Sequence, residues 1–187
     1  NAYIVMEFVQ GISLRQYLES RNQPMSFTEA WNFLLPVMEA LEKVHQNKLI
    51  HRDISPDNFI IKEDGSIKLL DFGSAREYAE EKTMTVLVKK GYAPPEQYSR
   101  KGKQGPWTDI YSICATLYEM ITGVIPQPAM ERLKADKLYL PSSYGCDITP
   151  LQEKILMKGL ALDYKKRYKD IAELKNSFFP EKQERQK

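Results

Sequence analysis

The segment from Asp109 to Thr122 most constrains the fold, because apolar side chains occupy nearly every face of the helix it would form. These apolar residues are Ile110, Ile113, Cys114, Leu117, Met120 and Ile121. Thr108 can cap the helix and Gly123 can end it. A helix that is apolar all round is stable when other elements cover it on every side. We therefore expect a domain built around this one helix.

The rest of the chain predicts further helices and a few short strands. Caps and helical spacing indicate one helix from Ser13 to about Ser20 and another from about Tyr168 to Phe178. A third helix should follow the Ser26/Glu29 capping pair and contain Pro36. A fourth should begin at Thr149-Pro150-Leu151-Gln152. Apolar runs indicate strands at 3–6, 49–50, 59–61 and 67–70, with Asp64-Gly65 as a hairpin turn. Residues 74–90 are polar without a clear period and predict a loop. The expected fold is mainly α with small β-hairpins.

Composition bounds the classes of function. The chain has 187 residues, 42% hydrophobic and 28% charged, which suits one soluble globular domain. A formal net charge of +2 gives no reason to expect nucleic acid, and no apolar run is long enough to span a membrane. Two cysteines, Cys114 and Cys146, are too few for a disulfide framework or a zinc site, so we expect a cytoplasmic segment.

Two polar motifs point to one chemistry. The first is His51-Arg52-Asp53-Ile54-Ser55-Pro56-Asp57-Asn58, and the second is Asp71-Phe72-Gly73. Asp53 can accept a proton from a hydroxyl, while Asn58 and Asp71 offer the oxygen ligands that Mg²⁺ prefers. A lone aspartate after a strand is usually a turn residue or a helix cap. The two motifs together, in this order, favour a catalytic role.

These motifs resemble the H-R-D-x-x-x-x-N catalytic loop and the D-F-G metal loop of protein kinases, and the layout is similar to bacterial eukaryotic-like Ser/Thr kinases. The resemblance implies transfer of phosphate from ATP, with Mg²⁺, to Ser/Thr hydroxyls of a protein substrate. It implies a C-terminal kinase lobe (α+β) over residues 10–179, after the end of an N-lobe strand and the hinge at 1–9 and before a charged tail at 180–187. No Gly-rich loop or V-A-I-K-type lysine is present in the sequence. We therefore expect this segment alone to be inactive, to need an N-lobe as partner, and to self-associate through the uncovered face.

The resemblance also assigns roles to single residues. Met6, Glu7 and Val9 match the gatekeeper and hinge positions, with Ser13 near the ribose and Ile60 and Leu70 as apolar contacts of the nucleotide. Glu96 would pair with Arg167, and Asp109 would bond the catalytic-loop backbone. Arg52 before Asp53 implies an activation loop that phosphorylation orders, with Thr83 and Thr85 as acceptors. His51 is interpreted as a packed loop residue.

Two positions depart from the family pattern. Ser55 stands where Ser/Thr kinases carry a catalytic-loop lysine, and Lys89 stands where they carry a threonine. One interpretation is an exchange: in the active state Lys89 folds toward Asp53 near the transferring phosphate, and Ser55 lies within hydrogen-bond reach of either group. The alternative is that Ser55 is a turn residue before Pro56 and that Lys89 faces water.

Two other functions remain open at this point. A small-molecule phosphotransferase similar to aminoglycoside or choline kinases also uses an H-x-D-x-x-x-x-N loop, but Phe72-Gly73 and the Pro95-Glu96 anchor disfavour it. A non-catalytic binding module with a kinase fold is the other alternative. The presence of Asp53, Asn58 and Asp71 disfavours that interpretation.

Overall fold

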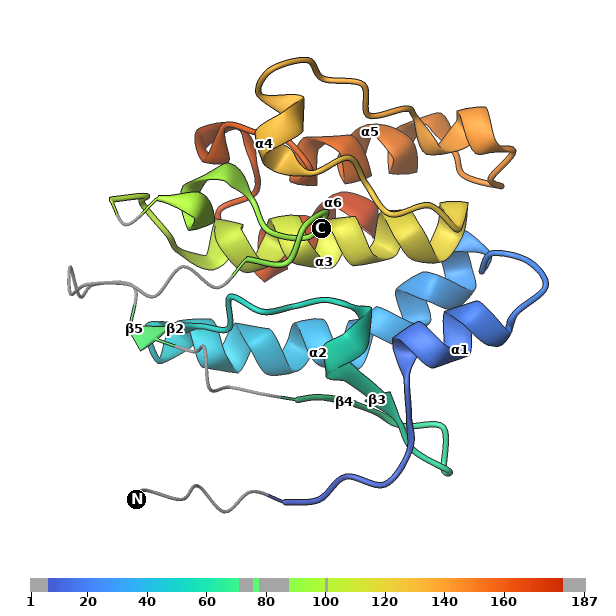
Figure 1. Ribbon diagram of the computed structural model, residues 1–187. Helices are drawn as coiled ribbons and strands as arrows, with labels where there is room; N and C mark the ends of the chain where they lie inside the picture. Colours follow the sequence, from blue (N-terminus) through green and yellow to red (C-terminus); the bar gives the residue numbers. More distant parts are fainter. Residues whose placement is uncertain (1–6, 71–75, 78–87, 100, 180–187) are drawn as a thin grey trace, which may run out of the picture.

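The computed structural model describes residues 7–70, 76–77, 88–99 and 101–179 (Figure 1). Its α-helices are α1 (Leu14–Ser20), α2 (Phe27–Gln46), α3 (Pro106–Thr122), α4 (Ala129–Arg132), α5 (Pro150–Gly159) and α6 (Ile171–Phe178). Its strands are β1 (Ile12–Ser13), β2 (Leu49–Ile50), β3 (Phe59–Ile61), β4 (Ile67–Leu69) and β5 (Arg76–Glu77). Four short 3-10 helices complete the described part: η1 (Pro56–Asn58), η3 (Pro95–Tyr98), η4 (Pro141–Tyr144) and η5 (Tyr164–Lys166).

Helix α3 is the central helix that the sequence predicts. It lies between α2 on one side and the α4 and α5 layer on the other (Figure 1), and every residue from Thr108 to Thr122 is buried. The helix begins at Pro106 rather than Asp109, because proline fits the first turn of a helix. Thr108 is therefore inside the helix, where its hydroxyl accepts the N–H of Gly105 at 3.2 Å. In the described parts of the chain no helix is long and apolar enough to cross a membrane.

The other helix ends mostly follow their capping residues. Ser13, Ser26 and Thr149 cap α1, α2 and α5 as predicted, each accepting a backbone N–H three residues on. Helix α2 continues through Pro36. Helix α6 begins at Ile171 rather than at Tyr168, because the Asp170 carboxylate accepts the Glu173 N–H and fixes the first turn there.

Two small antiparallel sheets lie beside this helical core. One has the order β1-β3-β4, and β3 and β4 form the predicted hairpin, with Gly65 in the left-handed region at φ 77°. The other pairs β2 with β5, which lies inside the stretch 74–90 that predicts only a loop. Two paired residues give no periodic signal, so the sequence cannot reveal such a strand. The strand predicted at 3–6 lies outside the described residues.

Candidate active site

The backbone of the catalytic loop is held by Asp109, a fully buried residue in the first turn of α3. Its carboxylate accepts the N–H of His51 at 2.8 Å and the N–H of Arg52 at 2.9 Å. The same carboxylate lies 2.8 Å from Nε2 of His45 on α2. The loop therefore has a fixed position relative to α3, through the contact that the sequence assigns to Asp109. His51 is packed, as interpreted, with Nε2 3.1 Å from the Leu70 carbonyl oxygen.

Arg52 adopts a left-handed backbone conformation at φ 68°, which is costly for a residue with a Cβ. Its carbonyl oxygen accepts a hydrogen bond from Nε2 of the buried Gln97 in η3. The bonds from Asp109 and Gln97 on either side of this residue stabilise the turn. They present the next residue, Asp53, in a half-buried position at the loop surface.

Asn58 links the two ends of the catalytic loop. Its Nδ2 donates to the Asp53 carbonyl oxygen at 2.7 Å, so its amide oxygen faces away and is available to a hard cation. The Asn58 carbonyl oxygen accepts the N–H of Leu70 at 2.7 Å. This bond brings the residue before Asp71 against Asn58. Asp71 itself lies outside the described residues, as do Met6, Thr83 and Thr85, so their assignments stay predictions.

Lys89 contacts Asp57, a carboxylate that the sequence does not assign to it, while its contact with Asp53 in the active state stays a prediction. Its ammonium lies 2.7 Å from Oδ2 of Asp57, and not beside Asp53. Burial raises the pKa of Asp57, but the hydrogen bond and charge of Lys89, with the charge of Arg15, outweigh it and lower that pKa. The hydroxyl of Ser55 is fully buried and has no hydrogen-bond partner among the described residues, and its contact in the active state stays a prediction as well. Asp57 is the nearer anion because the turn at η1 exposes it beside residues 88–90.

The residues predicted to contact a nucleotide are partly brought together. Ser13 on β1 pairs with Ile60 on β3, and Leu70 follows directly after β4 in the same sheet. The Ser13 hydroxyl is already used as the N-cap of α1, where it accepts the Gln16 N–H. At the hinge, Val9 is half-buried, and the exposed Glu7 forms an ion pair with Lys68.

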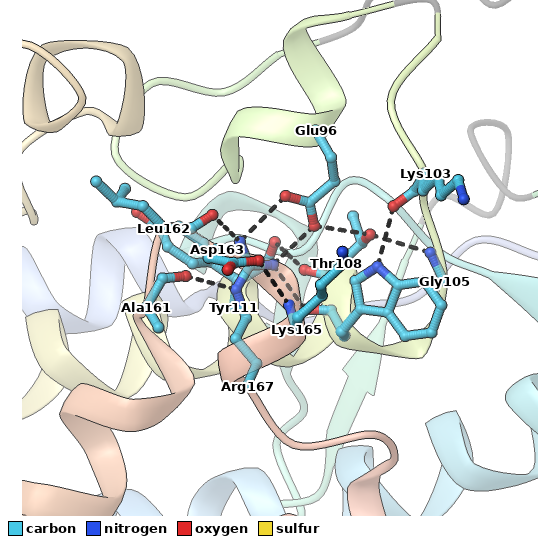
Figure 2. A network of polar contacts seen from close by, with 12 residues as sticks. Glu96, Lys103, Gly105, Thr108, Tyr111, Ala161, Leu162, Asp163, Lys165 and Arg167 are labelled. Carbon is cyan, nitrogen blue, oxygen red and sulfur yellow. Dashed lines mark hydrogen bonds and ion pairs between the residues drawn. The ribbon is translucent and has the colours of Figure 1, made fainter.

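Glu96 and Arg167 form the expected buried ion pair (Figure 2). Two guanidinium nitrogens of Arg167 lie 2.7 and 3.1 Å from the two carboxylate oxygens of Glu96, a bidentate arrangement. The hydroxyl of Thr108 donates to the same carboxylate at 3.1 Å. The remaining donors of Arg167 reach the carbonyl oxygens of Ala161, Leu162 and Trp107. All five N–H donors of the guanidinium are thus satisfied, and η3 is fixed to the loop before α6.

A second charged group beside the loop has no signal in the sequence. Arg15 on α1 donates to Glu119 on α3 and, at 2.5 Å, to the hydroxyl of Tyr92. That hydroxyl donates to the other oxygen of Glu119, and Nε of Arg15 lies 3.8 Å from Asp57. The partners are separated by up to 104 residues in the chain. No local pattern could bring them together, so only the folded structure reveals them.

The segment that carries Lys89 and Tyr92 also touches the link between α3 and α4. Gly91 has φ +90°, and a Cβ there would lie 2.5 Å from the Ile125 side chain and 3.1 Å from the Pro126 carbonyl oxygen. Only glycine fits this approach without a shift. The segment after Lys90 is thereby held close to the link that follows α3.

The family model for the protein kinase domain matches residues 1–173. The chain belongs to the protein kinase family. Among solved structures, a protein described as "PpkA-294 apo form" superposes with a TM-score of 0.75 at 30% identity, over 91% of this chain and 61% of that one. The kinase-like, helix-rich fold with a small antiparallel sheet is thus shown, in agreement with the resemblance of the two motifs.

Three curated relatives are bacterial kinases. The chain is 33% identical over 181 residues to the probable serine/threonine-protein kinase PknB of Lactococcus lactis, covering 92% of this chain and 28% of that protein. It is 34% identical over 192 residues to the serine/threonine-protein kinase PrkC of Bacillus subtilis, covering 94% and 29%. It is 32% identical to PknB of Mycolicibacterium smegmatis, covering 92% and 29%. The chain therefore spans less than a third of the length of these relatives.

Proposed function

We propose that the protein containing this chain transfers the γ-phosphoryl group of ATP to serine or threonine hydroxyls of proteins. The observation that supports this most is the presentation of Asp53. It lies at the surface of a loop whose backbone is bonded to buried Asp109, and Asn58 closes the loop from the other side. An aspartate in this position can orient an acceptor hydroxyl and take its proton.

ATP and Mg²⁺ fit the donors that the loop offers. The available group on Asn58 is an amide oxygen, and such hard oxygen ligands suit Mg²⁺ rather than a soft metal. Asn58, together with Asp71, would hold the metal, which when bound neutralises charge on the nucleotide phosphates. Ser13, Ile60 and Leu70 on the small sheet would line the nucleotide side, with Glu7 and Val9 at the hinge.

The acceptor side carries a lysine from outside the catalytic loop, whereas the loop lacks the usual lysine at position 55. Ser55 stands at the usual lysine position, and Lys89 reaches the loop from residues 88–90 through Asp57. We infer that Lys89 supplies positive charge near the acceptor when both substrates are bound. A switch through Arg52 and phosphorylated Thr83 or Thr85 remains part of the proposal and rests on sequence alone.

The decisive experiment compares two aspartate variants in the full-length protein. Asp53→Asn should lower kcat for transfer from labelled ATP to a protein acceptor by at least about 100-fold, the usual range for a lost general base. Asp147→Asn makes the same chemical change at an exposed residue far along the chain and should leave kcat unchanged. Equal rates for wild type and Asp53→Asn would overturn the proposed role of Asp53.

A further inference from the structure

Arg15 is shared between two carboxylates that come from different elements. Glu119 on α3 accepts a hydrogen bond from Nη1, and Asp57 in η1 lies 3.8 Å from Nε. The side chain of Glu119 is 6% exposed, that of Arg15 is 20% exposed and that of Asp57 is 41% exposed. The guanidinium is therefore placed between a buried anion and one at the surface of the catalytic loop.

The charges in this cluster balance. Lys89 and Arg15 are the two cations, and Asp57 and Glu119 are the two anions that they contact. Burial lowers the pKa of Arg15, but its bonds to Glu119 and Tyr92 outweigh this and raise that pKa, so the guanidinium stays charged. Burial and the neighbouring Glu119 raise the pKa of Tyr92, so its hydroxyl stays neutral. Both carboxylates are thus neutralised from within the chain.

The exposed part of the cluster lies on the catalytic loop, close in sequence to Asp53. Asp57 follows Asp53 by four residues on the same loop, and the side chains of Asp57 and Lys89 are 41% and 37% exposed. A peptide that presents a hydroxyl to Asp53 must cover such exposed neighbours. Arg15 and Glu119 also line a surface cavity of about 360 Å³ between α1 and the end of α3. That cavity offers space for a side chain of the peptide.

We propose that Arg15 is a specificity-determining residue, which occupies the position that a cationic side chain of an acceptor peptide would otherwise take between Asp57 and Glu119. The inference rests on the proposed function. It assigns to the protein a preference for acceptor sequences without arginine or lysine at this position. Removing the guanidinium should leave Glu119 without its cation and Asp57 with Lys89 alone. The cavity beside Glu119 should then become a subsite for a basic residue, because charge-assisted hydrogen bonds to carboxylates are strong.

Arg21 provides a matched control on the same cavity. Its guanidinium is 21% exposed, pairs with Glu29 at 2.8 Å and with the Tyr17 hydroxyl at 2.9 Å, and lines the cavity as Arg15 does. Its anionic partner, however, belongs to α2 and not to the catalytic loop or α3. Arg21→Gln therefore removes a similar guanidinium without releasing Asp57 or Glu119.

The test is a positional-scanning peptide library phosphorylated by the full-length protein. For Arg15→Gln, we expect kcat/KM to rise about fivefold or more when arginine replaces a neutral residue at one peptide position, which corresponds to about 1 kcal/mol. For wild type and Arg21→Gln, kcat/KM should change less than about twofold when arginine replaces a neutral residue at any peptide position. A purely structural Arg15 would lower activity without creating any new preference.

A second variant covers the case in which Arg15→Gln fails to fold around the buried Glu119. Arg15→Met combined with Glu119→Gln removes both buried charges and leaves Asp57 with Lys89 as its one remaining cation in the cluster, so a smaller gain of about threefold for basic peptides is expected. An unchanged profile in the folded variants would overturn the inference, as would a wild type that already prefers a basic residue through these carboxylates. A wild type that phosphorylates no peptide or protein would overturn the proposed function as well.

Discussion

Two ion pairs in this molecule, Glu96–Arg167 and Lys89–Asp57, differ in burial and therefore in role. Glu96 and Arg167 are buried, and every N–H donor of the guanidinium has an acceptor. Lys89 and Asp57 are each about 40% exposed at the catalytic loop. The first pair fixes two segments that are 71 residues apart, whereas the second leaves its members accessible to solvent and to a substrate.

The difference shows why ion pairs cannot be judged by their distances. Both pairs have nitrogen–oxygen distances of 2.7 Å. An exposed pair is screened by water and contributes little to stability, whereas breaking a buried pair leaves an unsolvated charge. The buried pair should therefore dominate stability, and the exposed pair should matter mainly for binding and transfer.

The largest effect is expected from Arg167→Met. The substitution leaves the Glu96 carboxylate buried without its cation, so the free energy of unfolding should fall by about 3–5 kcal/mol. Urea unfolding measures this directly. As a control, Arg21→Met breaks a half-exposed pair and should cost less than about 1 kcal/mol. An equal loss of unfolding free energy in the two variants would show that burial does not decide how much these pairs stabilise the fold.

An intermediate effect is expected from Asp109→Asn. The amide replaces one of two charged oxygens that accept from His51, Arg52 and His45, so unfolding should become easier by about 2–3 kcal/mol. The rate kcat should fall too, because this carboxylate orients the backbone beside Asp53. Asp170→Asn at the N-cap of α6 should be nearly neutral, since asparagine caps as well as aspartate. Similar unfolding midpoints for both variants would contradict the assigned role of Asp109.

The smallest effect on stability is expected from Lys89→Met, less than about 1 kcal/mol at pH 7. The folded-state pKa of Asp57 lies below its ordinary value of 3.8, so the pair stabilises the fold above that value and is lost as the pH falls through the folded pKa. The urea midpoints of wild type and Lys89→Met should therefore differ at pH 7 and converge as the pH falls below 3.8. A gap that widens as the pH falls would show that Asp57 is not the partner of Lys89.

The sequence predicts whatever depends on local spacing. The caps at Ser13 and Thr149, the Asp64-Gly65 hairpin and the all-apolar helix follow from patterns of a few residues. The Glu96–Arg167 and Asp109 contacts follow from the family resemblance rather than from spacing. The start of α3 was wrong by three residues, because Pro106 competes with Thr108 as a start signal.

The sequence does not predict contacts between side chains on segments that are far apart in the chain. The family pattern places Lys89 beside Asp53 in the active state, and nothing in the sequence indicates the contact of Lys89 with the exposed Asp57. Arg15, Glu119 and Tyr92 meet across α1, α3 and residues 88–93, and none carries a motif of its own. The partner of a charged side chain depends on packing, which local propensity does not encode.

Helix α3 also sets the distance between the two ends of the site. Asp109 and Glu119 are ten residues apart on one rigid, buried helix, which sets their separation along its axis at about 15 Å. The first holds the backbone of the catalytic loop, and the second reaches its Asp57 through Arg15. One residue inserted between them would turn one end by about 100° relative to the other, so the loop could keep its backbone contact or its side-chain contact, but not both.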